Sequence, residues 1–344
     1  MPGRTMKIAH IMAGATTGGA ELFYERLTIA MGQVGDDVLP VIRRDPGRAQ
    51  RLRAGGLKPR ELGFGGPLDI LTRPRLAAEL RRFAPRVAVA WMNRAARFTP
   101  VGDWVLAGRL GGFYDLSYYR LCDHLIGNTR GIVDWITGHG WPAARAHYLP
   151  NFVPDMAGAS SAVLDVPAGA PIVLALGRLH RNKAFDVLIR ALPALPSAHA
   201  VIAGEGPERG ALLDLARREQ VADRVHILGW RQDTAALLAA SDVLVCPSRH
   251  EPLGNVVIEG WSAGRPVVAA ASAGPVELIR DGADGLLVPV DDAAALARAL
   301  DRTLSDRDYA MSLAQAGRIR YEADFAQTSV VARWRQFLAT VEKA

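Results

Sequence analysis

Short apolar stretches alternate with amphipathic ones along the sequence, and the alternation runs through two rounds. This pattern predicts parallel strands joined by helices that cover the sheet. In the first half we expect strands at Lys7–Ala13, Asp37–Ile42, Arg86–Trp91, Trp104–Arg109 and Asp123–Asn128. The clearest helix is predicted at Ala20–Met31, where apolar residues recur at helical spacing. The sequence therefore predicts the α/β class.

Between the two rounds lies a stretch, residues 150–171, that favours no regular element because prolines, glycines and other small residues interrupt it. A chain of 344 residues also exceeds what one core usually organises. We therefore predict a linker at residues 156–168, between an amino-terminal domain at 1–155 and a carboxyl-terminal domain at 169–327.

The second half of the sequence repeats this alternation of predicted strands and helices. Strands are expected at Pro171–Gly177, Ala198–Gly204, Val225–Leu228, Asp242–Pro247, Pro266–Ala270 and Gly285–Pro289. Helices are expected at Ala184–Leu192, Pro207–Glu219, Thr234–Ala239, Leu253–Ala263, Asp292–Leu304, Asp306–Tyr321 and Ser329–Val341. Gly264 is placed to end the fourth of these helices. Two doubly wound sheets in tandem result, and such sheets bind ligands on the loops that follow the carboxyl ends of their strands.

Composition excludes several classes of protein. Hydrophobic residues make up 49% and charged residues 22% of the chain, so it is not globally disordered. No apolar run approaches the length of a membrane span, and we expect no secretory signal. The two cysteines, Cys122 and Cys246, are too few for a disulfide framework. These features favour the cytoplasm.

Positive charge is concentrated in the first half. Residues 1–160 carry 21 Lys and Arg against 13 Asp and Glu, whereas residues 161–344 carry 20 against 22. From Arg43 to Arg97 there are 14 basic and 4 acidic residues, which would attract nucleic acid, acidic lipid or a phosphorylated acceptor. Alternatively, the arginines only solvate helix faces. This second interpretation concerns Arg48, Arg51, Arg53, Arg73, Arg75, Arg81 and Arg82.

The first candidate site is the loop Gly177-Arg178-Leu179-His180-Arg181-Asn182-Lys183, directly after the first strand of the second half. A strand-end glycine lets the chain turn, and the cations of Arg178 and Lys183 can converge on one ligand. Arginine offers phosphate a planar fork of donors and lysine a mobile point charge. The pair therefore suits a diphosphate leaving group, although a solvated basic turn would look the same.

The second candidate site is Glu251-Pro252-Leu253-Gly254-Asn255-Val256-Val257-Ile258-Glu259. Pro252, expected near the first helical position, and Gly254 indicate a helix start, whose free N–H groups attract phosphate. Glu259 follows Glu251 by a little over two helical turns and can reach another part of the same ligand. Carboxylates accept hydrogen bonds from sugar and ribose hydroxyls. The apolar neighbours of Glu259 predict a semi-buried carboxylate rather than a surface one.

These motifs, and the order in which they follow one another along the chain, resemble those of the retaining GT-B glycosyltransferases of family 4 (glycosyl transferases group 1). Members of this family move a sugar from a nucleoside diphosphate to an acceptor. The resemblance covers nearly the whole chain and is strongest over Gly177–Pro289. Besides the two candidate sites it includes Gly204-Glu205-Gly206-Pro207, Pro247-Ser248, Ala263-Gly264-Arg265-Pro266 and Asp281-Gly282-Ala283-Asp284-Gly285. It implies two Rossmann-like domains that face a central cleft. The amino-terminal domain would bind the acceptor, and a helix at 328–344 would pack back on it.

The resemblance also implies roles for individual residues. Arg178 and Lys183 would hold the diphosphate and Glu251 the hydroxyls of the donor sugar, and these three are the candidate catalytic residues. Glu259 would bind the ribose, and the loops at Gly204–Gly206 and Trp230–Gln232 would border the base. The full set of implied substrate-binding residues is Gly18, Gly19, Gly204, Gly206, Trp230, Leu253, Gly254, Asn255 and Glu259.

One loop departs from the family pattern. Many members carry a histidine after the fifth strand of the first domain, whereas residues 110–115 here read Leu-Gly-Gly-Phe-Tyr-Asp. Tyr114 or Asp115 could contact the donor or the acceptor instead. Asp115 could equally cap the helix that follows.

The resemblance implies transfer of a hexose-type sugar from a nucleoside-diphosphate sugar to an acceptor hydroxyl, in the synthesis of lipopolysaccharide, exopolysaccharide or another envelope glycan. No cofactor and no metal are expected, because the Asp306-Arg307-Asp308 pair is better explained by helix capping. The expected partners are the nucleotide sugar and a glycan or lipid-linked acceptor, and the basic half could contact an acidic membrane at its inner face.

Four other functions remain as alternatives. A sugar-nucleotide epimerase or a phosphorylase would use the same scaffold. A dinucleotide-dependent oxidoreductase is disfavoured because the turn at Gly14–Gly19 lacks the G-x-G-x-x-G spacing. A nucleic-acid-binding protein would explain the pI near 9.6, but aromatic residues for base stacking are sparse. We expect Phe64, Phe83, Trp91 and Phe98 in the core instead.

Overall fold

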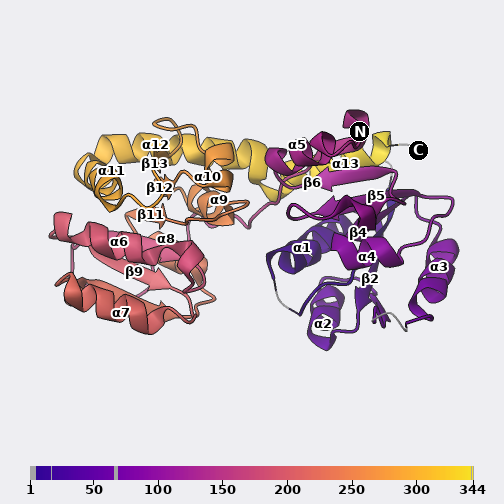
Figure 1. The fold of residues 1–344 in the computed structure, drawn as a ribbon, viewed down its shortest axis with the longest axis horizontal. Helices are drawn as coiled ribbons and strands as arrows, with labels where there is room; N and C mark the ends of the chain where they lie inside the picture. The colour runs from indigo at the N-terminus through magenta and orange to yellow at the C-terminus, as the bar shows by residue number, and fades with distance from the viewer. Residues whose placement is uncertain (1–4, 17, 66–68, 342, 344) are drawn as a thin grey trace. The chain divides into compact units, whose positions relative to one another are not determined.

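The computed structural model describes residues 5–16, 18–65, 69–341 and 343, and its contacts divide the chain into two α/β units (Figure 1). Unit 1 extends to Asn151 and includes the residues from Gln327 onward, whereas unit 2 is Phe152–Ala326. Each unit contains one parallel sheet with helices packed on it. The predicted α/β fold with two doubly wound sheets is confirmed.

Unit 1 holds a seven-stranded sheet in the order β3-β2-β1-β4-β5-β6-β7, with every pair of neighbours parallel. The strands are β1 Lys7–Met12, β2 Asp37–Arg43, β3 Arg60–Leu62, β4 Val87–Trp91, β5 Val105–Leu110, β6 His124–Gly127 and β7 Ala146–Tyr148. All five predicted strands are present. The three-residue edge strands β3 and β7 were not predicted, because neither forms a long apolar run.

Helices cover the sheet of unit 1. They are α1 Gly19–Gln33, α2 Pro46–Ala54, α3 Thr72–Phe83, α4 Met92–Phe98, α5 Arg130–Gly138 and α13 Gln327–Thr340. The predicted helix at Ala20–Met31 is confirmed as α1. Phe64 is fully buried in one core, and Phe83 and Phe98 pack against it. Trp91 is also fully buried, and it stacks on Trp334. The four aromatic residues expected in the core are therefore found there.

Unit 2 holds a six-stranded parallel sheet in the order β10-β9-β8-β11-β12-β13. The strands are β8 Ile172–Leu176, β9 His199–Ala203, β10 Val225–Gly229, β11 Val243–Cys246, β12 Val267–Ala270 and β13 Leu286–Val288. The six predicted strands are all present. Their apolar runs are continuous because helices cover both faces of a parallel sheet.

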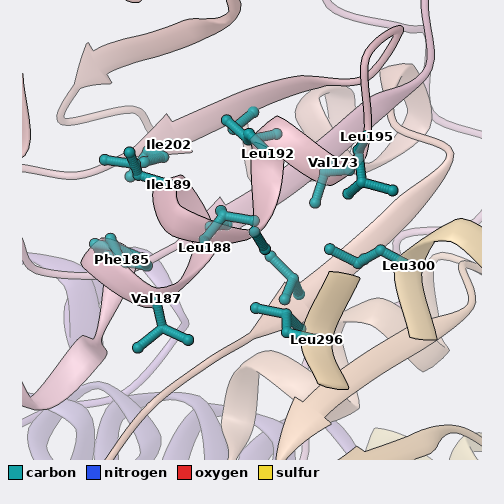
Figure 2. Packing of buried hydrophobic residues seen from close by; sticks show 14 of the residues in the cluster. Val173, Phe185, Val187, Leu188, Ile189, Leu192, Leu195, Ile202, Leu296 and Leu300 are labelled. Carbon is teal, nitrogen blue, oxygen red and sulfur yellow. The ribbon is translucent and has the colours of Figure 1, made fainter. Parts of the chain in front are cut away.

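The helices of unit 2 are α6 Phe185–Ala191, α7 Arg209–Arg218, α8 Thr234–Ala240, α9 Asn255–Ser262, α10 Ala273–Leu278, α11 Ala293–Ser305 and α12 Arg307–Arg320. Leu188 and Leu192 on the α6 side pack with Leu296 and Leu300 of α11 in one core (Figure 2). Gly264 lies just past α9 with a φ of 65°, as predicted for a helix stop. The Asp306 carboxylate accepts the Tyr309 N–H at 3.0 Å, which confirms the predicted capping role.

Residues 156–168 contain no helix or strand, and they pack on unit 2. Ala162, Leu164 and Val166 contact its core, whereas Val163 is 97% exposed. The Ala162 N–H also donates to the Ala236 carbonyl at 2.9 Å. Alternate apolar residues therefore bind this segment along unit 2, and the chain changes units at residues 151–152 and again at 326–327.

Helix α13 lies in unit 1, on the core that β1 and β4 form. The ring of Trp334 is fully buried and stacks on Trp91, with centroids 6.2 Å apart and planes 7° apart. Around the helix, Arg86 Nε donates to the Leu338 carbonyl at 3.0 Å, and Arg335 lies 3.4 Å from Asp36. Among the described residues, no helix is both long and apolar enough to cross a bilayer.

Candidate active site

The candidate residues of unit 2 lie on loops that follow neighbouring strands. The loop after β8 carries Arg178 and Lys183, and the loop after β11 carries Glu251. Gly204 and Gly206 follow β9, and Trp230 follows β10. Since β10, β9, β8 and β11 are adjacent and parallel, these loops share one edge of the sheet.

The loops after β8 and β9 are joined backbone to backbone. The Gly177 N–H donates to the Ala203 carbonyl at 3.1 Å, and the Leu179 N–H donates to the Glu205 carbonyl at 2.8 Å. A Cβ on Gly204 would lie 1.8 Å from the Gly177 oxygen, and one on Gly206 would lie 2.3 Å from the Leu179 oxygen. Both positions therefore require glycine for the loops to approach each other. The ligand contacts expected of these glycines stay predictions.

Lys183 and Glu251, 68 residues apart in sequence, form an ion pair between Nζ and Oε2. Glu251 is only 9% exposed, and its Oε1 accepts the Gly254 N–H at 3.4 Å. The Lys183 side chain passes over Gly177, since a Cβ there would lie 3.4 Å from its Cε. The structure thus brings two of the three candidate catalytic side chains together. The third, Arg178, is exposed, and its side chain has no polar partner within the described part of the chain.

Two further residues, Arg249 and Ser248, hold this pair in place. Arg249 reaches Asp186 at 2.7 Å and the Arg181 carbonyl at 2.8 Å, which ties the β11 loop to the β8 loop. The Ser248 hydroxyl lies 3.5 Å from Glu251 Oε2. Ser248 belongs to the Pro247-Ser248 motif of the resemblance, whereas an arginine next to a strand end gave no distinctive signal in sequence.

Cys246 ends β11 beside this pair. Burial, followed by the nearby Glu251 carboxylate, raises the pKa of the Cys246 thiol to about 11. The thiol therefore stays protonated at neutral pH and donates to Ser248 Oγ at 3.6 Å. Since the thiolate is the reactive form, Cys246 serves packing rather than nucleophilic chemistry.

Helix α9 begins later than predicted. It starts at Asn255, with Gly254 at the N-cap, and Pro252 lies outside it rather than near its first position. The reason is the φ of 82° at Gly254, a left-handed conformation that cannot continue into a helix toward Pro252. The Gly274 N–H donates to the Glu251 carbonyl at 2.7 Å, which fixes the loop before the helix.

The start of α9 offers hydrogen-bonding groups. Within the described residues no side chain caps the helix, and the buried Asn255 Oδ1 has no partner. The first N–H groups of a helix lack intrahelical acceptors, so those of Asn255 and Val256 are suited to an anion.

The other candidate residues of unit 2 differ in exposure. Leu253 is half-buried, and Glu259 lies on α9 and is partly buried, as the sequence predicted for this carboxylate. Trp230 is 71% exposed next to the β9 loop.

In unit 1, Gly18 and Gly19 join β1 to α1. The buried Glu21 carboxylate accepts the Ala15 N–H at 2.9 Å. A Cβ on Gly14 or on Gly18 would lie 2.3 Å from its oxygens, whereas one on Gly19 would meet nothing within 4 Å. Gly14 and Gly18 therefore make room for Glu21, a role that the sequence did not reveal.

The structure shows what Asp115 does in the loop at 110–115. Asp115 accepts the Ser117 N–H at 2.9 Å and caps the short 3₁₀ helix Leu116–Tyr119, so the capping interpretation is correct. Tyr114 is partly buried, and its hydroxyl lies 3.9 Å from the Met92 sulfur. Burial raises the pKa of Tyr114, which keeps the hydroxyl protonated.

The basic stretch of unit 1 divides into buried and exposed arginines. The expectation that Arg48 solvates a helix face is wrong, because it is fully buried and pairs with Glu25 at 3.0 Å. Its Nη2 also donates to the Ala15 carbonyl at 2.6 Å, which supports the β1–α1 loop. Arg51 shares Glu25 at 2.6 Å. The arginines of α3, in contrast, are exposed: Arg73, Arg75, Arg81 and Arg82.

Comparisons with known proteins show which family and fold the chain resembles. Residues 170–306 match the family model described as Glycosyl transferases group 1. The chain is 36% identical to the lipopolysaccharide core biosynthesis glycosyltransferase LpsE of Rhizobium meliloti, over 97% of this chain and 99% of that protein. It is 32% identical to LpsD of the same organism, over 94% and 96% respectively. The crystal structure of Anabaena Alr3699/HepE in complex with UDP matches with a TM-score of 0.82 and 20% identity, covering 98% of this chain and 100% of that one.

Proposed function

The chain belongs to the glycosyl transferases group 1 family and is a GT-B glycosyltransferase, and from this premise we propose that it transfers a hexose from a nucleoside-diphosphate sugar with retention and without a metal ion. The observation that carries the proposal is the Lys183–Glu251 pair at the carboxyl edge of the unit 2 sheet, beside the start of α9. A cation, a carboxylate and free helix N–H groups are what a diphosphate attached to a sugar requires.

In the proposed reaction, the bond between the anomeric carbon and the diphosphate oxygen breaks, and its electron pair stays with the diphosphate. The acceptor hydroxyl oxygen forms the new bond to the anomeric carbon on the same face. Its proton passes to an oxygen of the departing diphosphate, so the products are a glycoside and a nucleoside diphosphate. Negative charge on the leaving group therefore grows in the transition state, where Lys183 and Arg178 stabilise it.

The remaining candidate residues receive their roles within the same proposal. Glu251 binds the sugar hydroxyls once Lys183 turns to the diphosphate, and Glu259 accepts from the ribose. Trp230 borders the base together with the loop at Gly204–Gly206. Its 71% exposure leaves the indole face open to stacking.

We assign the acceptor to unit 1, where Gly18 and Gly19 lie at the carboxyl edge of the sheet. Two relatives that match over nearly their whole length are named for lipopolysaccharide core biosynthesis, which supports an envelope glycan as acceptor. An epimerase or a phosphorylase would share the scaffold. Release of glycoside only when acceptor is added distinguishes transfer from epimerisation.

Donor binding is tested by thermal shift with a panel of nucleoside-diphosphate sugars. We expect one donor to raise the melting temperature in proportion to the logarithm of its concentration, because a ligand of the folded state stabilises it by mass action. Sugar transfer from that donor should persist in EDTA. Strict dependence of transfer on a divalent metal would contradict the metal-independent scheme, and a panel without any shift would contradict donor binding.

We also propose that unit 1 contacts an acidic membrane. Arg73, Arg75 and Arg81 on α3 are exposed without ion pairs to described residues, and Ile70 just before them is 79% exposed. We expect co-sedimentation with vesicles that contain anionic lipid and release as salt is raised. Equal binding to neutral vesicles would contradict the electrostatic contact.

A further inference from the structure

Unit 1 contains a cavity of about 370 Å³ that the proposed function does not yet use. Its lining comes from the carboxyl ends of β2, β1, β4 and β5, which are neighbours in the sheet. Gly14 follows β1, Arg43 ends β2, Asn93 and Arg94 follow β4, and Tyr114 follows β5. Open parallel sheets bind their ligands at this edge.

The charge on the lining has one sign. Arg43 and Arg94 are exposed, and among the described residues neither side chain has an ion pair or a hydrogen bond. No described lining residue carries a carboxylate. The Glu21 carboxylate packs against Gly14 and is bound to the Ala15 N–H, but it does not line the cavity. Two arginines without counter-charges therefore face one small space.

The neutral polar groups of the lining are also donors. The Tyr119 hydroxyl donates to Asn93 Oδ1 at 2.8 Å, which leaves the Asn93 amide nitrogen to donate. The Tyr114 hydroxyl, which lies 3.9 Å from the Met92 sulfur, is a second neutral donor, and burial raises its pKa. The donors of Arg43, Asn93, Arg94 and Tyr114, with no carboxylate among the described lining residues, match an oxyanion rather than a neutral hydroxyl, which needs an acceptor as well.

The backbone at this point is strained. Met92 has a φ of 63°, a left-handed conformation that a residue with a long side chain rarely adopts. Such a conformation persists only where the surroundings enforce it, and it is frequent at ligand sites. Here it turns the chain directly out of β4, so that Asn93 and Arg94 reach the cavity.

We propose that this cavity binds an oxyanion of the acceptor, a phosphate monoester or a carboxylate, and that Arg43 and Arg94 are the residues that select an anionic acceptor. Only one part of this inference rests on the proposed function, namely that the bound oxyanion belongs to the acceptor. Oxyanion binding by unit 1 follows from the cavity itself and is tested separately from transfer.

The experiment titrates the full chain with glucose 6-phosphate, glucuronate and glucose by isothermal calorimetry. We expect at least one of the two anionic sugars to bind on the order of tenfold or more tightly than glucose, since charge-assisted hydrogen bonds are about twice as strong as neutral ones. Comparing the two identifies phosphate or carboxylate as the preferred group. Arg43→Gln and Arg94→Gln should each weaken that binding on the order of tenfold and leave glucose unchanged.

The matched control is Arg26→Gln, which removes the same charge from an exposed position on α1. It should change the affinity less than twofold. Equal affinity for the three sugars overturns the proposal, and so does an equal loss in the control. Anion binding that survives both Arg43→Gln and Arg94→Gln, as it would if unit 2 held the phosphate, overturns it too. The thermal shift with nucleoside-diphosphate sugars should be unchanged in both variants. This measurement therefore tests donor binding separately from oxyanion binding.

Discussion

Replacing Lys183 or Arg178 by alanine should lower the turnover of sugar transfer on the order of a hundredfold or more, because each loss of a fixed donor to developing negative charge costs about 3–4 kcal/mol of transition-state stabilisation. The effect should fall on kcat, since charge on the diphosphate grows as the bond breaks. Initial rates at saturating donor and acceptor measure it.

The two variants differ in their side effects. Lys183→Ala leaves the nearly buried Glu251 carboxylate without its cation, so a lower melting temperature is also expected. Arg178 is exposed without a partner in the described chain, so Arg178→Ala should melt like the wild type. Arg181→Ala, in the same loop, is the matched control and should keep its turnover. Normal transfer by Lys183→Ala or Arg178→Ala would refute the leaving-group assignment.

Trp334→Ala should lower the free energy of unfolding of unit 1 by about 3–5 kcal/mol, the usual cost of deleting a buried aromatic side chain. The ring is fully buried and stacks on Trp91, and its helix α13 covers the core that β1 and β4 form. Denaturant unfolding followed by hydrogen exchange in the two units separately measures the change.

The control on the same helix is Gln336→Ala, at an exposed position. It should change stability little, and unit 2 should keep its protection in both variants, since α13 is not part of it. Equal destabilisation of the two units by Trp334→Ala would show that the helix does not belong to unit 1 alone.

Sequence reasoning located the loops of the site but not their contacts. Continuous apolar runs predicted the long strands, and the rule that ligands bind at strand carboxyl ends directed attention to Arg178, Lys183 and Glu251. The Lys183–Glu251 pair could not be predicted, because it depends on β8 and β11 being neighbours in the sheet. The spacing of apolar residues along the sequence gives no information on the order of the strands in the sheet.

Other misses have equally specific causes. Arg48 carries the same charge as its exposed neighbours, and its burial depends on three partners that the fold brings to it: Glu25 of α1, Asp45 and the Ala15 carbonyl. The late start of α9 depends on the left-handed conformation of Gly254, which composition alone does not reveal. The linker at residues 156–168 was predicted from composition, which does not reveal that alternate apolar side chains of this segment contact unit 2.

From the placement of α13 in unit 1 we expect a particular order of folding during synthesis. Residues 152–326 leave the ribosome before residues 327–340 do, so unit 2 can fold while the nascent first unit still lacks a helix. Until then the Trp91 face of that unit stays uncovered, and exposed apolar surface of this kind invites aggregation and chaperone binding. We therefore expect unit 1, most of which is translated before unit 2, to mature after it.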